Sequence, residues 1–162
     1  MIDIEQRLGR LEDIEQIRNL TARYCRHLDD RNWDALMEQF TPDGEFDGLS
    51  HLVGRTEMRA FFSSLVSQGF SAVWHFTDNV EIEVDGDSAV VRSYLWQPFV
   101  SDGVSSIAAG RYTDHVTKVD GTWLYRIKQV RFNFWVPLAD GWDENVFSNE
   151  SARSAAVDPS RK

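Results

Sequence analysis

The chain is organised around residues 24–36, which read YCRHLDDRNWDAL. Apolar residues at helical spacing lead into this stretch, and the polar turn at residues 29–32 interrupts them. Tyr24 and Asp29 therefore lie near the end of a long helix, where their side chains are expected to point into the cavity that the helix covers. The other chemically suggestive residue is His75, in the apolar segment Val73-Trp74-His75-Phe76. We predict that the fold brings His75 to Asp29.

Helices are predicted in the first half of the chain. The first spans residues 3–28, with Asp3 as its N-cap. Its apolar residues recur at intervals of three and four and form one stripe: Ile4, Leu8, Leu11, Ile14, Ile17, Leu20, Tyr24 and Leu28. The first two turns of this helix are expected to project and to pack on a neighbouring subunit. A second helix at residues 33–40 follows an Asn32 cap, and a third at residues 57–67 follows Thr56.

The second half of the chain is predicted to be mostly strand. Segments rich in β-branched and aromatic residues alternate with tight turns, and they span residues 73–84, 89–100, 107–118 and 122–136. Before them, the turn signal Thr41-Pro42-Asp43-Gly44 leads into a short strand at residues 45–47. Consecutive strands joined by tight turns form an antiparallel sheet, so we predict an α+β domain with helices on one face of a curved sheet. Such a sheet and its helices enclose a cone that is open at one end.

The totals favour one globular domain. The chain has 162 residues, of which 42% are hydrophobic and 12% aromatic, and we predict one domain at residues 1–147 with a flexible tail at residues 148–162. The net charge of -9 makes nucleic acids and anionic membranes poor partners. The single cysteine, Cys25, excludes an internal disulfide. Since neither a signal peptide nor a membrane-spanning run is evident, we expect a cytoplasmic protein.

His75, Asp29 and Tyr24 have side chains suited to acid–base catalysis. A neutral imidazole accepts a proton near neutral pH when a carboxylate holds its other nitrogen and stabilises the imidazolium that forms. The Tyr24 hydroxyl is a suitable donor to a substrate carbonyl or to a leaving oxygen. Residue types alone favour a structural interpretation, in which His75 is a hydrogen-bonded core histidine, Asp29 a helix-end residue and Tyr24 part of the apolar stripe.

Two further polar neighbours lie on one predicted strand. Asp114 and His115 are adjacent, so their side chains point to opposite faces of the sheet. Asp114 shares its parity with Tyr112 and is the better candidate for the cavity if Tyr112 lines it. The sequence has no spacing typical of metal ligands and no phosphate-binding glycine loop, so we predict neither a metal nor a cofactor.

An ordered set of short motifs runs from about residue 8 to residue 138. The motifs are Tyr24-x-x-x-Leu28-Asp29-x-x-x-Trp33, Phe40-x-x-Asp43-Gly44-Glu45-Phe46, His75 followed by Asn79, Gly110-Arg111-Tyr112-x-Asp114, and Asp120-Gly121-x-Trp123. The set resembles the SnoaL-like branch of the nuclear transport factor 2-like superfamily. The families that it resembles most are scytalone dehydratase, bile acid 7α-dehydratase and γ-hexachlorocyclohexane dehydrochlorinase. The resemblance implies a cystatin-like, cone-shaped barrel whose three helices pack on the concave face of a curved mixed or antiparallel sheet.

The resemblance also implies a cofactor-free lyase with a His–Asp dyad. The dyad histidine of these families matches His75, the aspartate matches Asp29, and the tyrosine of the bile acid enzymes matches Tyr24. Pocket aromatics match Phe46 and Tyr112, and a basic residue on the last strand matches either Lys128 or Arg131. Scytalone dehydratase has a second histidine in a region that Tyr94 and Trp96 occupy here. The predicted substrate pocket therefore comprises Phe46, Tyr94, Trp96, Tyr112, Asp114, Lys128 and Arg131.

We predict a dehydratase-type elimination on a small, hydrophobic, cyclic molecule. Three alternatives remain open. An isomerase or cyclase of the same fold would return the proton to the substrate, a binding module such as a dioxygenase small subunit would catalyse nothing, and an orphan scaffold would fill its pocket with side chains. A homo-oligomer is expected, with a trimer favoured over a dimer, because the first helix and the outer face of the sheet carry apolar residues.

Overall fold

The structure is a computed structural model that describes residues 3–141. Its helices are α1 (Ile4–Asp29), α2 (Trp33–Glu38) and α3 (Arg55–Ser67). Its strands are β1 (Phe40–Asp47), β2 (His51–Val53), β3 (Phe70–Val73), β4 (Phe76–Asp85), β5 (Ser88–Ser101), β6 (Val104–Val119) and β7 (Thr122–Pro137). The predicted end of the domain at residue 147 and the predicted tail at residues 148–162 lie outside the described residues.

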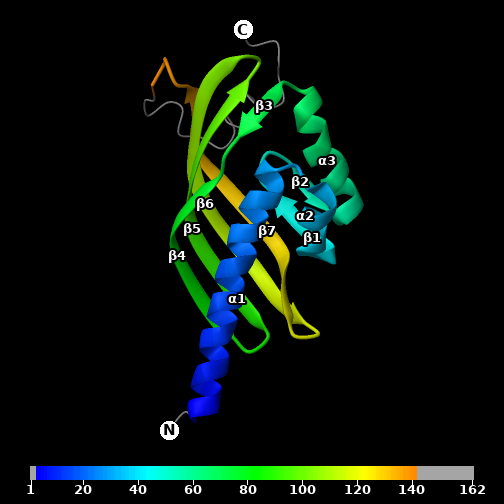
Figure 1. The fold of residues 1–162 in the computed structure, drawn as a ribbon, viewed down its shortest axis with the longest axis vertical. Coiled ribbons are helices and arrows are strands. Elements are labelled where there is room, and N and C mark those ends of the chain that lie inside the picture. Colours follow the sequence, from blue (N-terminus) through cyan, green and yellow to red (C-terminus); the bar gives the residue numbers. More distant parts are fainter. Residues whose placement is uncertain (1–2, 142–162) are drawn as a thin grey trace.

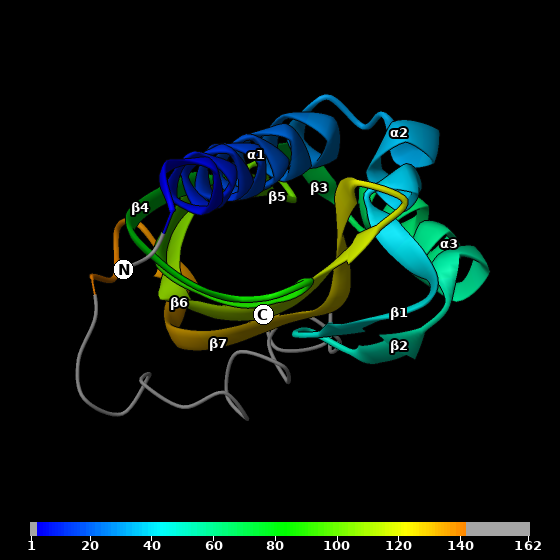
Figure 2. The same cartoon turned by 90° about the horizontal axis from the view of Figure 1, so that it is seen from below.

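The strands of this region form one mixed sheet. Its order is β2-β1-β7-β6-β5-β3, and β4 also pairs with β5. The long strands pair antiparallel, whereas β1 runs parallel to β7. Figure 2 shows that the sheet is curled and that α1 lies across its open side, with α2 and α3 near β1 and β2. The predicted α+β class, with helices on the concave side of a curved sheet, is confirmed.

A bulge in the middle of the sheet contributes to this curvature. The pairing of β6 with β7 shifts register between Ala109 and Gly110, and such bulges bend a strand and increase its twist. Gly110 has to be a glycine because a Cβ atom there would lie 2.5 Å from the carbonyl oxygen of Arg131. The glycine of the Gly110-Arg111-Tyr112 motif therefore serves the shape of the sheet.

Helix α1 contacts the sheet with only part of its length. The Asp3 side chain accepts a hydrogen bond from the Glu5 amide, as the predicted N-cap requires. The first turns project beyond the strands (Figure 1), and their apolar residues are exposed: Ile4, Leu8 and Leu11. The stripe becomes buried further along, at Ile17, Leu20, Tyr24 and Leu28. The second half of α1 is therefore the part that roofs the interior.

Asp13 marks the point at which α1 meets the end of the β6–β7 hairpin. Its carboxylate accepts a hydrogen bond from the Trp123 indole at 2.9 Å and lies 2.6 Å from the Lys118 ammonium. Although burial alone raises the pKa of Asp13, these contacts outweigh it and lower the pKa below its usual range. The contact fixes how far along the sheet α1 lies, and with it the position of Asp29.

Several predicted boundaries were wrong. The predicted turn at residues 41–44 belongs to β1, where the pairing with β7 shifts register between Phe40 and Glu45, so Pro42 and Gly44 mark a bulge. Helix α2 ends at Glu38, and α3 begins at Arg55, after Gly54 with a φ of 86°. The Asn32 side chain makes no cap hydrogen bond.

No helix within residues 3–141 combines the length and apolar composition needed to cross a membrane.

Candidate active site

A pocket lies between the C-terminal end of α1, the inner side of α3 and the concave face of the sheet. Its wall is mostly apolar, with aromatic rings from Phe46, Phe62, Phe70 and Phe132 and indoles from Trp33 and Trp135. The wall also contains five residues with polar side chains: Tyr24, Arg31, His75, Gln97 and Tyr112. Apolar cavities with a few convergent polar groups are typical of small-molecule sites.

His75 and Asp29 meet at the edge of this pocket. The Nδ1 atom of His75 lies 2.5 Å from Oδ1 of Asp29, and the His75 backbone N–H donates to Oδ2 at 3.0 Å. The His75 side chain is only 8% exposed and that of Asp29 19%. Because a carboxylate accepts hydrogen bonds, this contact assigns a proton to Nδ1, so Nε2 is the nitrogen of the neutral ring that can act as a base. The structure thus brings the predicted dyad together.

His75 lies in the break between β3 and β4, and the alternation of side chains that continues through this break points it inward. Strand residues alternate between faces, and the flanking Trp74 and Phe76 are 50% and 57% exposed. His75 therefore shares the inner face with Val73, which also lines the pocket. The predicted continuous strand at residues 73–84 missed this break, although its alternation still gives the correct face.

Arg31 ties the end of α1 to the strand before His75. Its φ of 59° stops the helix after Asp29. Its guanidinium then donates to the carbonyl oxygens of Phe70 at 3.3 Å and Ser71 at 2.7 Å. Because Asp29 and Arg31 both bind the segment that carries His75, the dyad is held at two points.

Two tyrosines belong to the pocket wall to which His75 also contributes. Tyr24 is 1% exposed and Tyr112 3%, and both line the cavity. Burial, together with nearby acidic groups that include Asp114, raises the pKa of each phenol well above its ordinary value. Both therefore remain protonated over the physiological range and can act as hydrogen-bond donors.

Lys128 and Asp114 form a buried ion pair behind these tyrosines. Neither side chain is exposed, and Lys128 Nζ lies 2.7 Å from Asp114 Oδ2. The ammonium also lies 4.3, 3.9 and 4.6 Å from the ring centres of Tyr24, Tyr112 and Tyr125. Burial raises the pKa of Asp114, while Lys128 opposes that rise. The prediction that Lys128 and Asp114 line the pocket is wrong, because the tyrosine rings separate them from it.

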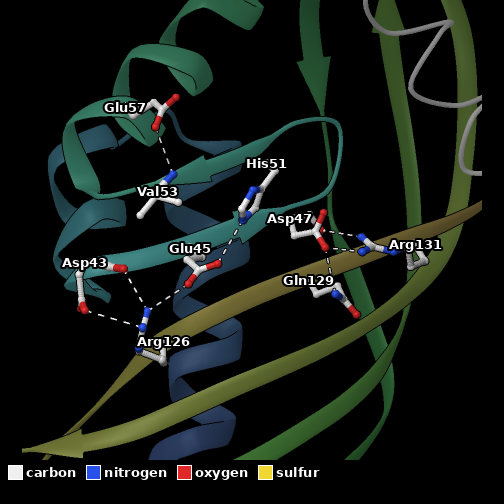
Figure 3. Close-up of polar contacts among 9 residues, drawn as sticks. All are labelled: Asp43, Glu45, Asp47, His51, Val53, Glu57, Arg126, Gln129 and Arg131. Carbon is white, nitrogen blue, oxygen red and sulfur yellow. Dashed lines mark hydrogen bonds and ion pairs between the residues drawn. The ribbon is translucent and has the colours of Figure 1, made fainter.

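Three other predicted pocket residues lie elsewhere. Tyr94 and Trp96 are 44% and 46% exposed on the outer face of β5, because the alternation places Leu95 and Gln97 inside. Arg131 also points outward, and its guanidinium binds the carboxylate and the carbonyl oxygen of Asp47 (Figure 3). Of the predicted wall residues, only Phe46 and Tyr112 line the cavity.

The pocket also contains polar residues that sequence reasoning missed. Gln97 and Arg31 both line it, and neither belongs to a recognisable catalytic motif. The alternation of β5 was a usable signal, because Gln97 lies between the buried Leu95 and Phe99 on one face. Within residues 3–141, no group of three His, Cys, Asp or Glu side chains is arranged to hold a metal ion.

Solved structures with the same architecture include two proteins from Novosphingobium. A protein of N. aromaticivorans described as a candidate scytalone dehydratase is 22% identical, with a TM-score of 0.73 over 86% of this chain and 93% of that one. The hexachlorocyclohexane dehydrochlorinase LinA-type3 of N. barchaimii is 23% identical, with a TM-score of 0.74 over 82% of this chain and 94% of that one. At such identities the likeness shows a shared fold.

Comparison of sequences identifies the family to which the chain belongs. The uncharacterized protein Rv2910c of Mycobacterium tuberculosis is 31% identical over 98 residues, which cover 59% of this chain and 67% of that protein. The family model of the SnoaL-like domain matches residues 9–130, a range that includes both residues of the dyad and both pocket tyrosines. The chain therefore belongs to the SnoaL-like domain family.

Proposed function

We propose that this protein is a cofactor-free lyase that eliminates water or a halide from a small, hydrophobic, cyclic molecule. The observation that carries the proposal is the contact of 2.5 Å between His75 Nδ1 and Asp29 in a largely apolar pocket. A buried imidazole whose second nitrogen faces such a pocket is suited to removing a proton from carbon. The names of the dehydratase-like and dehydrochlorinase neighbours are consistent with this reaction class.

The elimination begins at Nε2 of His75. This nitrogen takes a proton from a substrate carbon, and the electrons of that C–H bond form a carbon–carbon double bond as the leaving group departs with its own bonding pair. Asp29 stabilises the imidazolium through Nδ1–H. A leaving hydroxyl departs as water after it takes that same proton back from Nε2 of His75, while Tyr24 donates a hydrogen bond to the leaving oxygen. A leaving chloride needs no proton.

Isomerisation would use the same groups, since it differs only in returning the proton to another carbon. His75, which contacts Asp29, lines one cavity together with two tyrosines that remain protonated, and this favours catalysis over a purely structural module. Product analysis separates elimination from isomerisation, because only elimination releases water or halide.

The test is a product screen with matched variants. Wild-type protein is incubated with cyclic β-hydroxyketones and chlorinated cyclohexanes, and products are identified by mass spectrometry. We expect dehydration or dehydrochlorination, and a fall in turnover of about a hundred- to ten-thousand-fold in His75→Gln. His115→Gln is the control because this exposed histidine lies on the outer face of β6. Equal turnover in His75→Gln and wild type would refute the proposal.

A further inference from the structure

Gln97 is, like Tyr24 and Tyr112, a polar residue of the pocket wall whose side chain makes no hydrogen bond within residues 3–141. Gln97 is 5% exposed and lines the pocket, and its carboxamide bonds to no other residue in the range 3–141. Its neighbours on the inner face of β5, Leu95 and Phe99, are apolar and buried. The Gln97 amide is not among the fully buried polar atoms of this region that lack a partner, so it faces the cavity and can bond to a molecule bound there. Its retention in a pocket wall therefore points to a ligand that supplies the missing hydrogen bond.

The strand register places Gln97 directly across from His75. Val73 pairs with Phe99 before the break between β3 and β4, and Phe76 pairs with Trp96 after it. Counting inward from either pair sets His75 opposite Gln97. The hydrogen bond from the Trp74 amide to the Pro98 carbonyl, at 3.1 Å, maintains this register across the break. Directly opposed residues point to the same face, with Cβ atoms about 4.5–5.5 Å apart.

From this juxtaposition we propose that Gln97 is a specificity-determining residue that selects substrates with a carbonyl oxygen close to the carbon deprotonated by His75. The inference rests on the proposed function and narrows its substrate class to cyclic ketones and related carbonyl compounds. The Gln97 amide N–H donates to the carbonyl oxygen while the neighbouring C–H faces Nε2 of His75. A carbonyl at that position acidifies the C–H bond, and the amide stabilises the negative charge that develops on oxygen.

The chemistry of the surrounding wall supports this assignment. Asp29 occupies Nδ1 of His75, so the Gln97 amide does not compete for that nitrogen. Tyr24 lies on α1, and its phenol remains available for the leaving group. The site therefore offers a base from the break between β3 and β4, a donor for the carbonyl from β5 and a donor for the leaving oxygen from α1.

A binding measurement tests the inference without requiring turnover. The probes are 2-tetralone and tetralin, which have the same ring skeleton and differ in one carbonyl group. Their dissociation constants are measured by quenching of tryptophan fluorescence, since Trp33 and Trp135 line the pocket. We expect wild-type protein to bind 2-tetralone about three- to tenfold more tightly than tetralin, the range of one net hydrogen bond.

Three variants complete the experiment. Gln97→Met keeps the length of the side chain and removes its hydrogen bonds, so the preference for the ketone is expected to disappear; Gln97→Leu serves if that variant does not fold. Ser93→Ala is the control, because Ser93 is buried on the same face of β5 but does not line the pocket, and it should keep the preference. A preference that persists in Gln97→Met, or is absent from wild type, overturns the inference. Ketone preference without turnover would refute only the proposed function.

Discussion

The buried ion pair behind the tyrosines gives a prediction about stability. Replacing Lys128 with Met removes the ion-pair partner of the Asp114 carboxylate, which is fully buried. Breaking a buried pair by removing one member costs about 3–5 kcal/mol, because an uncompensated charge remains. Since about 1.4 kcal/mol is a factor of ten, the ratio of folded to unfolded protein should fall by roughly two to four powers of ten.

Urea unfolding followed by circular dichroism measures this loss. With a slope of about 2 kcal/mol per molar urea for a domain of this size, the midpoint of Lys128→Met should fall by about 1.5–2.5 M. The double variant Asp114→Val/Lys128→Met should recover most of the loss, since apolar replacements of a buried pair are often neutral or stabilising. Lys118→Met, which removes the partly exposed partner of Asp13, is the control and should lose far less. A single variant as stable as wild type would show that the pair is not buried as described.

Three further predictions concern the tyrosine, the cysteine and the outer face of the sheet. Tyr24→Phe should lower turnover about ten- to a hundredfold. Because burial raises the pKa of Tyr24 and keeps the phenol protonated, the turnover of the variant relative to wild type should be the same from about pH 6 to pH 9. A relative turnover that changes over this range would contradict the prediction. Cys25 is buried with a raised pKa, so its modification by iodoacetamide should be slow in the native protein and fast in urea, and equal rates would refute its burial. Trp96 and Phe76 are exposed on the outer face, so light scattering should show a trimer that Trp96→Lys weakens, and a monomeric wild type would oppose this.

Local pattern was sufficient for much of the architecture. The spacing of apolar residues located α1, and the hairpin turns located the three long strands β5, β6 and β7 to within a few residues. Parity also separated Asp114 from His115, since the first is buried and the second exposed. These features depend on short-range periodicity, which the sequence displays directly.

The errors arose where long-range pairing decides the outcome. Nothing near residues 41–44 indicates that β1 continues through a bulge to lie beside β7, because its partner is far along the chain. The three-residue strand β2 was missed, since it is too short to show a periodic pattern. Proline and glycine in this segment are equally compatible with a turn and with a bulged strand.

In the candidate active site as well, some residues could be placed from the sequence and others could not. The pairing of His75 with Asp29 followed from the family resemblance, and the geometry of the structure agrees with it. Parity on β5 was available in the sequence and should have excluded Tyr94 and Trp96 in favour of Gln97. The depth of Lys128 could not be predicted, because it depends on the three tyrosine rings that surround its ammonium.

The protonation of the His75 ring is the most direct test of the dyad. Nitrogen-15 NMR of the histidine side chains distinguishes the tautomers, and the three other histidines serve as internal references. We expect that the neutral His75 ring carries its proton on Nδ1 and leaves Nε2 unprotonated, and that Asp29→Asn removes this preference. A His75 ring protonated on Nε2, or a tautomer unaffected by Asp29→Asn, would contradict the claim that Asp29 prepares His75 to act as the base.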